Sequence, residues 1–108
     1  MKPSPDPSFC ADRMKVLSDV TRLSVLEALL AGPKNVTELN AGIRIDQSLL
    51  SHHLKVLRDA GLVTARREGK AVRYEIAREA RSRAAGKAIN LGCCRVSFER
   101  LDPRKRAP

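Results

Sequence analysis

Apolar residues recur at helical spacing over the first third of the chain. Between Ala11 and Leu30, the spacing of methionine, leucine and valine predicts two helices. The break falls near Ser18, and either Ser18 or Asp19 can cap the second helix through its side-chain oxygen. This part of the sequence therefore predicts a pair of amphipathic helices joined by a short turn.

Two more helices are predicted after Gly32-Pro33, which ends the second helix. A short third helix is expected to begin at Thr37 and to close at Gly42. Asp46 can cap a fourth helix that runs to about Ala60. The apolar stripe of this helix has the spacing i, i+4 and i+7 and consists of Leu50, Leu54 and Leu57.

The pattern then changes to the alternation that is typical of strands. Residues 62–67 and 71–76 predict two strands with a turn centred on Gly69. Residues 78–92 are rich in alanine and predict a final helix. The expected fold class is mainly α with a small β-hairpin wing: a winged helix-turn-helix in the order α-α-α-α-β-β-α.

Length and composition predict one domain with an aliphatic core. The 108 residues are 43% hydrophobic but only 3% aromatic, with no Trp, which suits packed helices stabilised further by a partner chain. We expect a disordered, proline-rich lead over residues 1–8, a domain for DNA binding and dimerisation over 9–95, and a basic tail over 96–108.

The charge predicts a polyanionic partner. A formal net charge of +9 and a pI near 10.2 attract nucleic acid, and counterion release adds to the binding free energy. The cations are spread over several short elements, which argues against a membrane surface as the partner. No apolar stretch is long enough to span a bilayer and the first residues lack a signal-peptide core, so we expect a cytoplasmic protein.

The fourth helix carries short polar side chains on the face opposite its leucine stripe. Gln and Ser can read base edges in the major groove, while Lys contacts phosphates. An ordinary solvated face is the alternative, but a basic hairpin follows directly. The candidate DNA-binding residues of this helix are Gln47, Ser48, Ser51, His52 and Lys55.

Cations also cluster around the hairpin turn. Long cationic side chains at a hairpin tip can reach phosphates or enter the minor groove, and they also protect an edge strand from pairing. These two roles are compatible. The candidate residues of the hairpin are Arg66, Arg67, Lys70 and Arg73.

Three segments together resemble the ArsR/SmtB family of winged-helix repressors. They are residues 17–26 (LSDVTRLSVL), residues 48–63 (SLLSHHLKVLRDAGLV), and residues 67–70 (REGK) with Arg73-Tyr74. The resemblance covers roughly residues 11–92. It implies a homodimer whose first and last helices form the interface and whose fourth helix reads an inverted-repeat operator. It also implies repression that a metal, a metalloid or thiol oxidation relieves.

Two of the sensor sites that this resemblance implies lack their ligands here. Thr37-Glu38-Leu39-Asn40-Ala41 stands where a Cys-Val-Cys arsenic site would lie, and the predicted last helix contains no histidine for a zinc site. Adjacent residues on a helix point about 100° apart and chelate one ion poorly, so we assign His52 to DNA and His53 to helix packing.

The remaining candidates are the adjacent thiols of Cys93 and Cys94, with Cys10 as a third ligand. Three thiolates suit the trigonal pyramid of trivalent arsenic or antimony. The resemblance implies that Cys10 of one subunit meets Cys93 and Cys94 of the other. The expected inducer is As(III) or Sb(III), and DNA binding itself requires no cofactor.

Several alternatives stay open. The thiols can form a redox or persulfide switch in which oxidation links Cys10 to one of the pair, or they can bind softer cations such as Cd(II), Pb(II) or Hg(II). They can also simply fill an interface as small apolar residues. A basic RNA-binding or interaction module without an effector is a different class, disfavoured by the few stacking aromatics. No nucleophile and base arrangement or phosphate loop suggests an enzyme.

Overall fold

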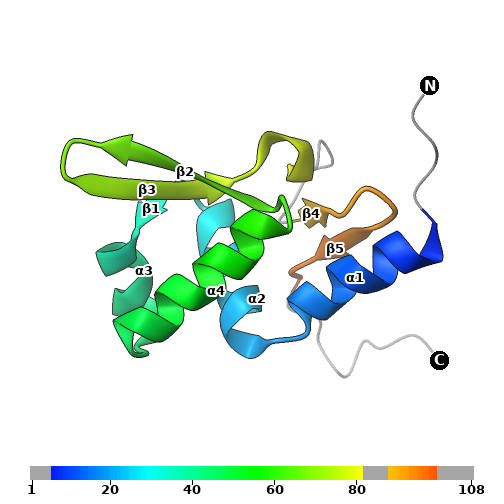
Figure 1. Ribbon diagram of the computed structural model, residues 1–108, viewed down its shortest axis with the longest axis horizontal. Helices are drawn as coiled ribbons and strands as arrows, with labels where there is room; N and C mark the ends of the chain where they lie inside the picture. Colours follow the sequence, from blue (N-terminus) through cyan, green and yellow to red (C-terminus); the bar gives the residue numbers. More distant parts are fainter. Residues whose placement is uncertain (1–5, 82–87, 100–108) are drawn as a thin grey trace.

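The computed structural model describes residues 6–81 and 88–99, and it has a helical body with a projecting β-hairpin (Figure 1). The elements follow one another as α1 (Pro7–Leu17), α2 (Val20–Leu30), β1 (Lys34–Asn35), α3 (Val36–Ile43), α4 (Gln47–Asp59), β2 (Val63–Glu68), β3 (Ala71–Ile76), a 3₁₀ turn η1 (Arg78–Ala80), β4 (Ala88–Asn90) and β5 (Arg95–Ser97).

The two predicted N-terminal helices are present and break where the sequence indicates. Asp19 caps α2, since its side chain accepts a hydrogen bond from the backbone N–H of Arg22 at 3.0 Å. Helix α1 begins before Ala11, where the helical spacing was expected to start, because Asp6 caps it and Pro7 occupies its first turn, where the missing N–H costs nothing. Residues 1–5 of the expected lead lie outside the described residues.

Helices α3 and α4 form the predicted helix-turn-helix. Helix α3 begins at Val36, one residue before the expected start, because Asn35 and Glu38 form a reciprocal capping box with hydrogen bonds of 2.8 and 2.9 Å. Asp46 caps α4 as expected, and its side chain accepts from the backbone N–H of Ser48 at 3.3 Å. The two helices are therefore delimited by local polar side chains.

The core is aliphatic, as the composition predicts. It is built largely from leucine and contains His53 as the one buried polar or charged residue among those described. The large side chains that are fully buried are Val25, Leu26, Leu39, Leu50, Leu54, Leu57, Leu62, Val63, Ile89 and Leu91. The predicted stripe of α4 therefore faces the core in full.

The predicted wing is an antiparallel hairpin with a third, short strand on its side. Strand β3 lies between β1 and β2, and the hairpin register pairs Val63 with Ile76 and Glu68 with Ala71. The two-residue turn begins at Gly69, whose φ of 61° is the value that the first residue of a type II′ hairpin needs.

The expected last helix over 78–92 is wrong for the residues that the structure describes. Residues 78–80 form a single 3₁₀ turn, and residues 88–97 form the β4–β5 hairpin; residues 82–87 lie outside the described part. Gly92 has a φ of 93° in the connecting turn, which is unfavourable for a helix. The expected tail over 96–108 begins inside β5, and its residues 100–108 are not described.

Candidate DNA interface and thiol cluster

The polar face of α4 is exposed, as a DNA-reading face must be. At about 100° per residue, its five candidate side chains fall within an arc of roughly 140° opposite the buried stripe. These exposed residues are Gln47, Ser48, Ser51, His52 and Lys55. Lys55 also forms an ion pair with Asp59 at 3.1 Å on the same helix. His53 is 7% exposed, which confirms its assignment to packing.

The turn between α3 and α4 is held by a side chain that the sequence analysis did not single out. The amide of Asn40 donates to the carbonyl of Ile45 at 2.9 Å and accepts from the backbone N–H of Ile45 at 2.8 Å. Arg44, between them, adopts a left-handed conformation with a φ of 58° and is exposed. Asn40 thereby fixes the turn that sets the angle between α3 and α4.

The cations of the wing divide into two groups. Arg66, Arg67 and Lys70 are exposed. Arg73 is half-buried and tied to the body: its guanidinium bonds to Glu68, donates to the carbonyl of Pro33 at 3.3 Å and lies 4.0 Å from Glu38. Arg73 is therefore engaged in holding the wing against the loop before α3.

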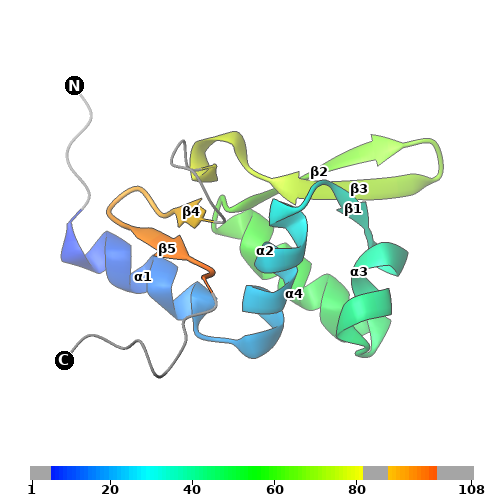
Figure 2. The same cartoon turned by 180° about the vertical axis from the view of Figure 1, so that it is seen from behind.

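The candidate DNA surface and the cysteines lie at opposite ends of the molecule. In Figures 1 and 2, the wing tip and α3 occupy one end, while α1 and the β4–β5 hairpin lie together at the other. Helix α4 extends between the two regions. An effector held at the cysteines would therefore act on the DNA surface through the helices and not by covering it.

All three cysteines meet at the end formed by α1 and the β4–β5 turn. Cys10, in the first turns of α1, forms a disulfide with Cys93, which lies 83 positions further along the chain. Cys94 is free and half-buried, with its Sγ 3.8 Å from the Sγ of Cys93. The resemblance implied a meeting across the dimer, but here the three residues meet within one chain.

The turn that carries the two adjacent cysteines is tightly built. The backbone N–H of Leu91 donates to the carbonyl of Cys94 at 2.9 Å, and the N–H of Gly92 donates to the side chain of Asn90 at 2.8 Å. A Cβ added to Gly92 would lie 3.3 Å from the ring of Phe9, next to Cys10. The close approach of this turn to α1 therefore depends on glycine.

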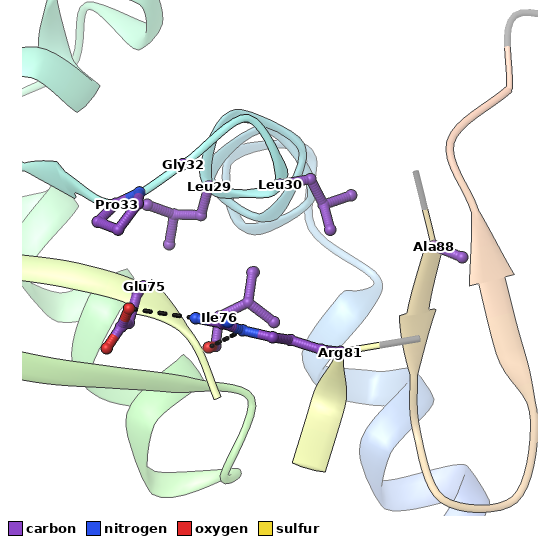
Figure 3. Close-up of a pocket in the computed structure, with 8 residues that line it drawn as sticks. All are labelled: Leu29, Leu30, Gly32, Pro33, Glu75, Ile76, Arg81 and Ala88. Carbon is purple, nitrogen blue, oxygen red and sulfur yellow. Dashed lines mark hydrogen bonds and ion pairs between the residues drawn. The ribbon is translucent and has the colours of Figure 1, made fainter. Parts of the chain in front are cut away.

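A cavity of about 310 Å³ lies between the end of α2 and the end of β3 (Figure 3). Arg81 reaches toward it, donating to Glu75 at 3.2 Å and to the carbonyl of Ile76 at 3.3 Å. Leu29 and Leu30 line the opposite wall. Arg81 and Glu75 are paired with each other. Among the described residues that line the cavity, no charged group is therefore directed at a ligand.

The fold and the exposed polar helix define a winged helix-turn-helix DNA-binding protein. Residues 19–65 match the arsR family of bacterial regulatory proteins. Over 100 residues the chain is 36% identical to the "Probable mercury resistance operon repressor" of Streptomyces lividans, and the alignment covers 85% of this chain and 80% of that protein. The chain belongs to the arsR family and is a transcriptional regulator, not an enzyme.

Two further similarities support this assignment. The "Arsenical resistance operon repressor" of Staphylococcus xylosus is 39% identical over 66 residues, which cover 61% of this chain and 64% of that repressor. A solution structure from Mycobacterium bovis, described as a homodimeric winged helix-turn-helix DNA-binding domain, aligns with a TM-score of 0.61 and 33% identity over 65% of each chain. Among the described residues, no helix has the length and apolar character needed to cross a membrane.

Proposed function

We propose that this protein is a homodimeric repressor that binds an inverted-repeat operator and releases it when As(III) or Sb(III) binds Cys10, Cys93 and Cys94. The observation that carries the proposal is the convergence of three sulfur atoms from the two ends of the described chain. The arsenical and mercury repressors among its relatives support an effector that binds thiolates.

The DNA-binding part of the proposal follows from exposure and charge. We assign Gln47, Ser48 and Ser51 of α4 to contacts with base edges because they are exposed, with the exposed His52 and Lys55 beside them. We assign the exposed cations of the wing, Arg66, Arg67 and Lys70, to contacts with phosphates or the minor groove. In a dimer, two such units read half-sites about one helical turn apart.

Dimerisation is supported by apolar side chains that one chain leaves exposed. Phe9 and Met14 of α1 are 37% and 50% exposed, and Val20 at the start of α2 is 82% exposed. A partner chain would remove these surfaces from water. The homodimeric structure from Mycobacterium bovis is in agreement with this arrangement.

The sulfur atoms are spaced for one bent ion site. Two thiolates bound about 2.3 Å from one ion lie at most about 4.6 Å apart, the separation at a linear angle. The Sγ atoms of Cys93 and Cys94 are 3.8 Å apart. A third thiolate from Cys10 would complete the pyramidal arrangement that trivalent arsenic and antimony prefer.

The site requires reduced cysteines. With Cys10 and Cys93 joined, the described residues contain no group of three or more His, Cys, Asp or Glu that could hold a metal ion. Reduction of this disulfide frees the thiols of Cys10 and Cys93 beside that of Cys94, and deprotonation of all three gives three thiolates. Metalloid binding and the disulfide therefore exclude each other.

The proposal is tested by fluorescence anisotropy of a labelled operator fragment with reduced protein. Arsenite or antimonite should release the DNA, and Zn(II) should not. The variants Cys10→Ser, Cys93→Ser and Cys94→Ser should still bind the operator and lose this response. A matched control is Ser97→Ala, which changes an exposed residue of the same hairpin and should respond as the wild type does. Full release from the three cysteine variants would contradict the ligand set.

A second function is favoured by the disulfide itself. Cys10 and Cys93 are placed so that hydrogen peroxide can take two electrons and two protons from their thiols, forming the S–S bond and two water molecules. Under this alternative, peroxide or polysulfide releases the operator and arsenite does not. Cys94→Ser separates the two functions, because it removes a metalloid ligand and leaves the Cys10–Cys93 pair intact.

A further inference from the structure

Arg22, in the first turn of α2, makes side-chain hydrogen bonds to two other helices. Its Nε donates to the carbonyl of Val16 in the last turn of α1 at 2.6 Å. Its Nη1 lies 3.1 Å from Nδ1 of His53, on α4. One guanidinium therefore links the helix that carries Cys10 to the helix that carries the candidate base-reading residues.

The donor chemistry of Arg22 assigns the hydrogen-bonding roles of the two ring nitrogens of His53. A guanidinium only donates hydrogen bonds, so Nδ1 of His53 accepts, and the proton of the neutral imidazole is on Nε2. Asp19 lies on the same side, with its Oδ1 4.0 Å from Nδ1 of His53. His53 is 7% exposed, so its orientation is fixed by surrounding side chains as well as by Arg22.

The rest of the boundary between α1 and α4 is loosely filled. A groove of about 440 Å³ lies there, lined by Phe9, Arg13 and Val16 of α1 and by Val56, Asp59 and Ala60 near the end of α4. Direct contact between α1 and α4 is therefore limited along this groove. A displacement of α1 would reach α4 most directly at a point where the two helices share a bonded partner.

Both helices can carry a displacement along their length. Cys10 and Val16 lie on one continuous helix, so a change in the position of Cys10 also moves the Val16 carbonyl. His53 follows Ser51 and His52 on α4, whose backbone is one rigid ladder of hydrogen bonds. The pair Arg22 and His53 connects these two segments.

We infer that the Arg22–His53 hydrogen bond couples the cysteine cluster to α4, so that a change at Cys10 alters the placement of the DNA-reading face. This inference rests on the proposed function for its inducer. It makes Arg22 and His53 positioning residues that contact neither the inducer nor the DNA. Removing the bond should leave inducer binding in place and uncouple it from the operator.

The variants remove the Arg22–His53 hydrogen bond, and a separate measurement checks that each variant still folds. Arg22→Met removes the donor, and His53→Leu removes the acceptor and fills the buried position with an apolar side chain. His53→Asn places an acceptor oxygen close to the position of Nδ1 and should restore the link. Arg58→Met is the matched control, because it removes an exposed cation from α4. Circular dichroism confirms that each variant is folded.

The readout is the ratio of operator Kd with and without arsenite, measured on reduced protein, so that differences in basal affinity cancel. The wild-type ratio should be about 5–150. It should fall below about 3 in Arg22→Met and His53→Leu and stay near the wild-type value in His53→Asn and Arg58→Met. Arsenite binding, followed by ultraviolet absorbance of the arsenic–sulfur bonds, should be equal in all of them. A wild-type ratio in His53→Leu overturns the inference.

If arsenite does not bind, the proposed function fails, but the coupling between Cys10 and α4 can still be tested by a second perturbation. Reduction of the Cys10–Cys93 disulfide also changes the constraint on α1, and amide chemical shifts of residues 47–55 report on α4. Shifts that change in the wild type and not in His53→Leu support the coupling. Shifts that stay constant in the wild type, or that change equally in His53→Leu, overturn it.

Discussion

Replacing Asn40 by alanine should both destabilise the protein and weaken its binding to the operator. The Asn40 amide makes two hydrogen bonds with the backbone of Ile45, at 2.8 and 2.9 Å, across the turn between α3 and α4. A net contribution of about 1 kcal/mol for each bond gives a loss of about 2 kcal/mol in the free energy of unfolding. For a domain of this size, that loss lowers Tm by about 8–12 °C.

Asn40→Asp should fall between alanine and the wild type. The carboxylate keeps the acceptor for the Ile45 N–H, but it loses the donor to the Ile45 carbonyl. Thr37→Ala is the control on the same helix, because Thr37 is exposed, and it should change the free energy of unfolding by less than about 0.5 kcal/mol.

Unfolding is followed by circular dichroism at a fixed protein concentration, since the chain has no Trp and a dimer makes Tm concentration-dependent. Operator affinity, measured at one salt concentration, should fall by up to about tenfold in Asn40→Ala, because α4 is no longer held at its angle to α3. Unfolding and operator binding that both match the Thr37→Ala control would refute the role of Asn40.

Three further predictions each concern a single residue. Gly92→Ala should destabilise the protein by about 1–2 kcal/mol, because alanine is strained at a φ of 93° and its Cβ would lie 3.3 Å from the Phe9 ring; an unchanged Tm would contradict this. The pKa of Asp19 is lowered, chiefly because the backbone N–H of Arg22 donates to its carboxylate. Its stabilising contribution is therefore complete above the usual value of 3.8 and is lost as the pH falls through the lowered pKa, so unfolding measured against pH should show a weaker acid dependence in Asp19→Asn. Arg67→Ala should weaken operator binding and reduce the slope of log K against log salt by about two, one for each wing of the dimer, and an unchanged slope would mean that Arg67 contacts no phosphate.

The helix-turn-helix and the wing could be predicted because their signals are local. Asp46 caps α4 and the leucine stripe fixes its buried face, so the start of the helix and its exposed residues both follow from the sequence. Gly69 likewise predicts the hairpin turn. The same reasoning identified the surface character of the candidate DNA-binding side chains except Arg73, which is half-buried and bonded to Glu68 and Pro33.

The last element was predicted wrongly because composition was given more weight than pattern. Alanine between residues 78 and 92 favours a helix, but Asn90 and Gly92 form a turn in which the side chain of Asn90 accepts from the Gly92 N–H. Residues 95–99 alternate between exposed and half-buried, which is the period of a strand. That alternation was present in the sequence and indicated β5.

Contacts between distant residues could be predicted only in part. The three cysteines were grouped from their chemistry, but their meeting within one chain depends on the β4–β5 turn lying against α1. The packing role of His53 was predicted from its place on α4. Its bond to Arg22, 31 positions earlier, depends on the crossing of α2 and α4, which no local pattern encodes.

The most direct test of the central claim is X-ray absorption at the arsenic edge on reduced protein loaded with one equivalent of arsenite. We predict that arsenic has three sulfur neighbours in the wild type and two sulfurs with one oxygen in Cys10→Ser. Fewer than three sulfurs in the wild type, or three in Cys10→Ser, would contradict a site formed by Cys10, Cys93 and Cys94.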